Sequence, residues 1–177
     1  MNLASWVDRN GRRLPDAPAI ADGEQVHSTW SQFATRTAHI AGGLQDDLRL
    51  EPGSRVAIIM RNRPEYLEAM FGIWHAGLVA VPVNARLHRA EIAYILEHSG
   101  AALAITDDDH AEDVEALLGT VATLRTVIVA PGEHWSRLTD YSPMPIVDRL
   151  GSDPAWLFYT SGTTGRPKGA TLTNRNL

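Results

Sequence analysis

The feature that most constrains this chain is a series of short apolar runs that polar residues scarcely interrupt. Five such runs occur, at residues 56–60, 78–81, 101–105, 126–130 and 156–159. A strand with one face in water alternates apolar and polar residues, whereas a strand covered on both faces is apolar throughout. The runs therefore predict strands of a mainly parallel sheet with helices on both of its faces.

Helical patterns lie between the apolar runs. Thr29 has the character of a helix N-cap with Gln32 at the capping-box position, and Pro64 suits the first turn of a second helix. Two more helices are expected, one over residues 89–98 and one after Asp109 as its cap. Because strand and helix alternate, the fold class is predicted to be α/β, with a mainly parallel sheet flanked by helices.

Two stretches depart from this regular pattern. Gly42 and Gly43 fall inside the helix that follows Thr29, where they either weaken the helix or let another backbone approach it. Residues 131–154 are rich in Pro, Gly, Ser and Asp. They predict a long surface connection with one helical turn near Trp135.

Composition excludes several classes of protein. The chain has 177 residues, about one domain, and a net charge of -5, which argues against non-specific binding to nucleic acid or anionic lipid. It contains no cysteine, so disulfides, thiolate metal sites and a cysteine nucleophile are excluded. The first residues lack the apolar core of a signal peptide, and no apolar run approaches the length of a membrane span. We therefore expect a cytoplasmic protein without a transmembrane segment.

The stretch with the clearest chemistry is Tyr-Thr-Ser-Gly-Thr-Thr-Gly-Arg-Pro-Lys-Gly at residues 159–169, directly after the last apolar run. Its glycines allow the backbone to come close to a ligand and to turn successive N–H groups toward an anion. Its hydroxyl groups can turn toward phosphate oxygens, and Lys168 adds a flexible positive charge. The predicted phosphate-binding residues are Thr160, Ser161, Gly162, Thr163, Thr164, Gly165 and Lys168.

The stretch can be compared with a Walker A loop, a nucleophile elbow and an ordinary surface loop. It is not a Walker A loop, because Lys168 follows Pro167 and is not followed by Ser or Thr. It is not a nucleophile elbow either, because Tyr159 stands two residues before Ser161. Judged by composition alone, it could also be an ordinary flexible surface loop, since such loops favour Gly, Ser and Thr.

The pattern at 159–169 resembles the signature loop of the adenylate-forming superfamily, which includes acyl-CoA synthetases, peptide-synthetase adenylation domains and luciferases. The segments 55–58, 62–66, 77–87 and 91–100 are similar to the early region of acyl-CoA synthetases. The resemblance covers nearly the whole chain, although only the loop is diagnostic. Many members carry His where this chain has Asn174. An imidazole near the substrate is therefore in doubt for this chain, whereas phosphate binding by residues 159–169 is not affected. For Asn174 we favour a helix N-cap over a catalytic role.

The resemblance implies an ATP-dependent ligase of the fatty-acid–CoA type, with ATP, Mg²⁺ and CoA as its small-molecule partners and a carboxylic acid as its substrate. Residues 1–177 would be an incomplete N-terminal part of the large AMP-binding domain that ends just after the loop at 159–169. No catalytic residue is assigned in the chain, because the adenine, acyl, Mg²⁺ and catalytic lysine segments of the family lie downstream. We therefore expect the isolated chain to be inactive and to self-associate through an uncovered apolar face.

Two alternatives remain open within and beyond this family. The chain could be a truncated nucleotide-binding or interaction module without catalysis, or it could belong to another adenylating ligase of the same superfamily. An unrelated α/β domain with an ordinary Ser/Gly loop is a third interpretation.

No metal site is assigned in the chain. The cluster Asp107 to His110 lacks the spaced oxygens and the glycine of a calcium loop, and we interpret it as a solvated turn with a helix cap.

Overall fold

The computed structural model describes residues 1–160 and 167–177. Its centre is a six-stranded sheet with the strand order β6-β5-β3-β4-β7-β8. The strands are β3 (Arg55–Ile59), β4 (Val79–Pro82), β5 (Ala101–Thr106), β6 (Thr126–Val129), β7 (Pro154–Thr160) and β8 (Lys168–Thr173). The pairs β3–β4, β3–β5, β5–β6 and β4–β7 are parallel, and β7–β8 is antiparallel. The predicted α/β class with a mainly parallel sheet is confirmed.

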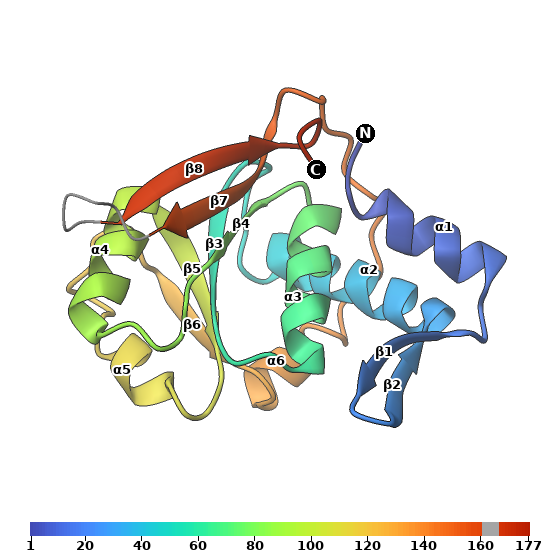
Figure 1. The fold of residues 1–177 in the computed structure, drawn as a ribbon, viewed down its shortest axis with the longest axis horizontal. Coiled ribbons are helices and arrows are strands. Elements are labelled where there is room, and N and C mark those ends of the chain that lie inside the picture. Colours follow the sequence, from blue (N-terminus) through green and yellow to red (C-terminus); the bar gives the residue numbers. More distant parts are fainter. Residues whose placement is uncertain (161–166) are drawn as a thin grey trace.

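Helices cover both faces of this sheet, as Figure 1 shows. The helices α2 (Trp30–Asp46), α3 (Pro64–His75) and α6 (Glu133–Arg137) share one apolar core with the sheet, while α4 (Arg89–Ser99) and α5 (Ala111–Glu115) share another. Strand β3 supplies both cores: Val56 and Ile58 face α2 and α3, and Ala57 and Ile59 face α4 and α5. All four of these side chains are fully buried, which explains the unbroken apolar run in the sequence.

The predicted helix ends agree with the structure in most cases. Thr29 caps α2, since its side chain accepts a hydrogen bond from the backbone of Gln32 while the Gln32 side chain accepts one from the backbone of Thr29. Pro64 is the first residue of α3. Helix α4 ends at Gly100, whose left-handed φ of 66° is the conformation that favours glycine. The cap predicted for α5 was wrong by one residue: His110 holds that position, and Asp109 pairs with Arg61 instead.

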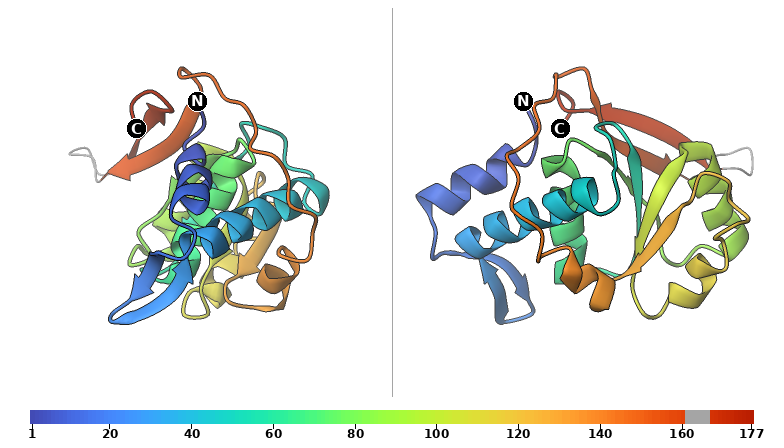
Figure 2. Two further views of the ribbon diagram at one scale, coloured as in Figure 1. Left: turned by 90° about the vertical axis from the view of Figure 1, so that its right-hand side faces the viewer. Right: turned by 180° about the vertical axis from the view of Figure 1, so that it is seen from behind.

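Three elements outside the predicted pattern complete the fold. Helix α1 (Ser5–Arg13) packs against α2, and β1 (Pro18–Asp22) and β2 (Gln25–Thr29) form an antiparallel hairpin beside them. The hairpin extends away from the main sheet in both views of Figure 2. The connection at 131–154 contains the expected helical turn, α6, but it is not confined to the surface. Trp135 is only 1% exposed and belongs to the core beneath α2.

The described residues contain no helix that is both long enough and apolar enough to cross a membrane.

Candidate functional site

The parallel strands place their carboxyl ends along one edge of the sheet, which is where open α/β sheets bind ligands. Strands β3, β4 and β7 are neighbours there, so their last residues, Ile59, Pro82 and Thr160, lie along the same edge of the sheet. The sequence predicted its phosphate-binding residues directly after β7. The edge of the sheet therefore provides the setting that such a site requires.

The described residues of the predicted phosphate site lie at the end of the β7–β8 hairpin where the chain passes from β7 to β8. Thr160 and Lys168 are register partners across the two strands, and both are exposed. Five further predicted residues, Ser161, Gly162, Thr163, Thr164 and Gly165, lie outside the described residues. Thr160 and Lys168 thus mark the two points at which the chain leaves β7 and returns in β8.

A cavity of about 610 Å³ opens beside this hairpin, between the carboxyl ends of β3, β4 and β7. Its wall includes two guanidinium side chains, two amides and three aromatic rings, from Arg61, Arg86, Asn62, Asn84, Tyr66, Phe158 and Tyr159. Positive charge next to amide and aromatic groups suits a ligand that carries both an anionic and a planar or polar part. Sequence reasoning missed this cavity. The signal was the position of Arg61, directly after the apolar run 56–60, and of Asn84, three residues after the run 78–81.

Asp107, directly after β5, links the carboxyl end of that strand to the carboxyl end of its neighbour β3. Its carboxylate, 1% exposed, accepts a hydrogen bond of 2.8 Å from the backbone N–H of Arg61 and another from the ring of His110. Burial on its own would raise the pKa of Asp107, but these hydrogen bonds and the nearby positive charges outweigh it, so the pKa lies below its ordinary value. The predicted solvated turn is therefore wrong for Asp107, which is a buried structural anion.

Neither the Asp107 region nor any other cluster offers a metal centre within the part of the chain that the structure describes. No group of three or more His, Asp or Glu side chains is arranged there to hold an ion.

Asn174 has a structural role at the end of β8. It is buried, and both its backbone N–H and its side-chain amide donate to the carbonyl oxygen of Asp153, at 3.0 and 3.1 Å. The described chain forms a turn after Thr173, so Asn174 caps no helix among these residues. Its side chain links the start of β7 to the end of β8.

Comparison with known proteins agrees with this geometry. A feruloyl-CoA synthase from Amycolatopsis sp is 40% identical over 176 residues, 99% of this chain and 34% of that protein. The long-chain-fatty-acid–CoA ligase FadD15 from Mycobacterium tuberculosis is 34% identical over 191 residues, 99% of this chain and 32% of that protein. The chain thus spans about a third of the length of the curated relatives it matches.

A solved structure gives the same result for the fold. The inhibitor-bound N-terminal domain of FACL13 from Mycobacterium tuberculosis superposes with a TM-score of 0.87 at 29% sequence identity, over 98% of this chain and 44% of that one. Residues 7–177 match the model of the family described as AMP-binding enzyme. This match removes the reading of an unrelated α/β domain with an ordinary loop. The chain belongs to the AMP-binding enzyme family.

Proposed function

We propose that this chain forms the ATP-phosphate-binding part of an AMP-forming acyl-CoA ligase of the fatty-acid–CoA type. The observation that carries the proposal is the location of residues 159–169. They join β7 to β8 at the carboxyl edge of a parallel sheet, with Thr160 opposite Lys168 and a cationic cavity alongside. The family match supports an adenylating reaction at this edge.

The chemistry proceeds in two displacements. A carboxylate oxygen of the acid bonds to the α-phosphorus of ATP while the bond to the β-phosphate oxygen breaks, so pyrophosphate leaves and an acyl-adenylate remains. The sulfur of CoA then bonds to the acyl carbon, and AMP leaves with the electron pair of the broken C–O bond.

The protein's part in the first displacement is to hold the leaving pyrophosphate. Lys168 provides a positive charge and Thr160 a hydroxyl group, and positioning with charge neutralisation supplies most of the catalysis in phosphoryl chemistry. When bound, Mg²⁺ would share the negative charge of the phosphates, and we expect its protein ligand to come from outside residues 1–177.

The names of the relatives point to two classes of acid: a hydroxycinnamic acid from the feruloyl-CoA synthase and long-chain fatty acids from FadD15. Exchange of labelled pyrophosphate into ATP, assayed with ferulate and with hexadecanoate, tests both the reaction and the acid class. Acid-dependent exchange by the protein at its native length supports the ligase. Binding of ATP without exchange for any acid in a wider panel would instead favour a nucleotide-binding module without catalysis.

We further propose that residues 1–177 alone do not turn over, and that they self-associate through the face of the β7–β8 hairpin that carries Phe158, beside the cavity. Phe158 is 45% exposed there, and a large exposed aromatic side chain is typical of a surface that another segment covers. Size-exclusion chromatography and the exchange assay on this polypeptide test both points. A monomer, or exchange above the blank, would contradict the respective statement. The expected cytoplasmic location stays part of the proposal, and cell fractionation would test it.

A further inference from the structure

The end of the β7–β8 hairpin that carries Thr160 and Lys168 is fastened to α4 by one polar contact. Tyr159, the residue before Thr160, places its phenol oxygen 2.8 Å from Nδ1 of His98 in the last turn of α4. In the tautomer that carries its proton on Nε2, His98 accepts the hydrogen bond from the phenol O–H. The two rings meet edge to face, with centroids 5.8 Å apart and an interplanar angle of 86°. Figure 1 shows this end of β7 and β8 lying over α4.

The other strand of the hairpin is shaped to receive the Tyr159 ring. Gly169 is the register partner of Tyr159. A Cβ atom on Gly169 would lie 2.9 Å from the ring carbon Cζ, closer than real Cβ atoms come to a neighbour, and 3.2 Å from the phenol oxygen. The ring of Tyr159 therefore lies against the bare backbone of Gly169. We call His98, Tyr159 and Gly169 the stem latch.

The support beneath the stem latch is rigid. His98 stacks on Tyr94, one turn earlier in α4, with ring centroids 5.5 Å apart at an angle of 26°. The opposite side of α4 is buried in the core through Ile92, Ile95 and Leu96, all of which are at most 2% exposed. Burial raises the pKa of Tyr159 and the neighbouring Tyr94 raises it further, so the phenol keeps its proton at neutral pH.

Apolar packing also holds this part of the hairpin, because Leu157 and Tyr159 lie against the core that α4 shares with the sheet. The register of β4 with β7 is recorded at Ala80 and Trp156, three residues before Tyr159. Beyond that point, no other side-chain hydrogen bond joins residues 157–160 or 168–172 to the rest of the described chain. The hydrogen bond from Tyr159 therefore adds the polar contact that, together with this packing, fixes the position of the strand ends that carry Thr160 and Lys168.

We propose that His98 is a positioning residue for ATP: through Tyr159 and Gly169 it holds Thr160 and Lys168 where they meet the β- and γ-phosphates. This inference rests on the proposed function of the loop. Its physical basis is preorganisation, because a stem that is already in place does not lose conformational freedom when the nucleotide binds. His98 itself touches the phenol and not the substrate.

The test is calorimetric titration of the native-length protein with MgATP and, separately, with AMP, which lacks the β- and γ-phosphates. We expect His98→Ala and Tyr159→Phe each to weaken ATP binding by about three- to tenfold, the range of one lost hydrogen bond, and to leave AMP binding unchanged. The double variant should bind ATP no more weakly than either single variant, because both remove the same contact. His98→Asn, which keeps a hydrogen-bonding atom near the Nδ1 position, should recover most of the ATP affinity.

Glu97→Ala, at an exposed neighbouring position of α4, serves as the matched control and should keep the original ATP affinity. A merely structural role of His98 would lower the binding of ATP and AMP alike, and that outcome overturns the inference. Unchanged ATP affinity in His98→Ala overturns it as well. If Lys168→Ala weakens ATP binding and His98→Ala does not, the inference about the stem latch is wrong, while the proposed function stands. If Lys168→Ala also has no effect, the phosphate-binding function itself fails.

Discussion

Thr160 and Lys168 face each other as the end pair of the antiparallel register between β7 and β8. Because directly opposed residues of two strands point to the same face, the hydroxyl and the ammonium group lie on one side of the hairpin. A single phosphate group can therefore reach both. The contributions of the two side chains to phosphate binding can therefore be compared by substituting each in turn.

The first prediction concerns the charge of Lys168. Lys168→Ala should lower kcat/KM for ATP about 10- to 100-fold, the size of a lost hydrogen bond to a charged group. Thr160→Val removes a neutral hydroxyl and should cost less than tenfold. Initial rates of pyrophosphate exchange at varied ATP give both numbers. A larger effect for Thr160→Val than for Lys168→Ala would contradict the assignment of Lys168 as the main phosphate contact.

The second prediction concerns Gly42 in α2. An alanine in an open helix position is more stable than glycine by roughly 0.5–1 kcal/mol. At Gly42, however, an added Cβ would collide with the backbone carbonyl oxygen of Ser142 in the connection between α6 and β7. Gly42→Ala should therefore destabilise the chain by about 1–3 kcal/mol, the usual cost of overpacking. Urea unfolding measures the difference, and a more stable variant would show that the connection can move aside.

The contact between Gly42 and Ser142 shows which part of the packing could be predicted from the sequence and which could not. The glycine pair at 42 and 43 indicated either a weakened helix or the close approach of another backbone. The structure shows the close approach. The neighbour itself could not be predicted, because Ser142 is a hundred residues away in a segment without periodicity. The capping box of Thr29 and Gln32 and the apolar runs were readable because their signals are local.

The elements that sequence reasoning missed have weak local signals. Strand β1 has one buried residue, Ile20, so neither an unbroken apolar run nor a clear alternation marks it. The two-residue turn Gly23-Glu24 between β1 and β2, which follows Asp22 and begins with glycine, was a hairpin signal that could have been used. Helix α1 contains Gly11 and gains its stability from tertiary packing, since an added Cβ there would lie 2.8 Å from Ala34 of α2. For the site, Arg86 and Phe158 meet only after the sheet has formed.

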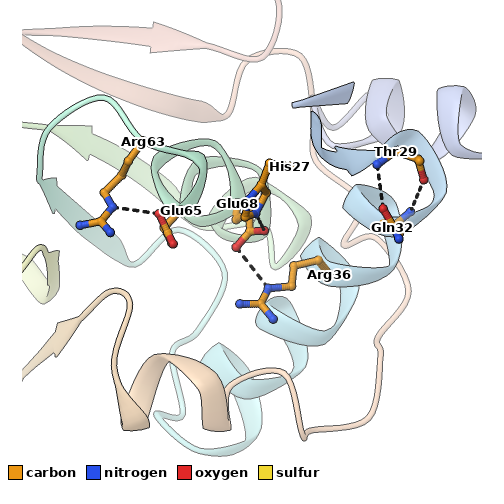
Figure 3. A network of polar contacts seen from close by, with 7 residues as sticks. All are labelled: His27, Thr29, Gln32, Arg36, Arg63, Glu65 and Glu68. Atoms are coloured by element: carbon orange, nitrogen blue, oxygen red, sulfur yellow. Dashed lines mark hydrogen bonds and ion pairs between the residues drawn. The ribbon is translucent and has the colours of Figure 1, made fainter. Parts of the chain in front are cut away.

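The third prediction concerns the polar network that fastens β2 to α2 and α3 (Figure 3). Glu68 of α3 is 4% exposed, and its two carboxylate oxygens contact Arg36 at 3.2 Å and His27 at 3.3 Å. Removing the buried carboxylate takes away the hydrogen-bond partner of Arg36 and His27, whose own side chains are 35% and 39% exposed and keep access to water. Glu68→Ala should therefore cost about 1.5–3 kcal/mol in the free energy of unfolding, the range of a lost hydrogen bond to a charged group.

The matched control for Glu68 is the exposed pair of Asp8 and Arg12 in α1, whose side chains are 36% and 72% exposed. Arg12→Ala should cost well under 1 kcal/mol, because water screens an exposed ion pair even when its atoms are close. Urea denaturation of both variants under identical conditions gives the comparison. Equal losses in the two variants would show that burial does not set the strength of the Glu68 network.

The fourth prediction concerns His75, a buried histidine at the end of α3. Its Nε2 atom lies 2.8 Å from the carbonyl oxygen of Met144, to which the neutral ring donates its N–H. Burial lowers the pKa of His75, and the contact with Met144 and the charge of Asp8 only partly oppose this. The folded chain therefore resists protonation at this position, whereas the unfolded chain takes up a proton near pH 6.5.

The sign of the pH effect follows from this difference. Below about pH 6.5 the unfolded state binds one proton more than the folded state, so His75 makes stability fall as the pH decreases toward the folded-state pKa. The slope from this one group cannot exceed about 1.4 kcal/mol per pH unit. His75→Gln keeps an amide that can donate to Met144 but cannot titrate. The stability lost between pH 7.5 and 5.5, measured by urea unfolding, should therefore be smaller in His75→Gln than in the original chain. An equal or larger loss in the variant would place the pH sensitivity elsewhere in the molecule.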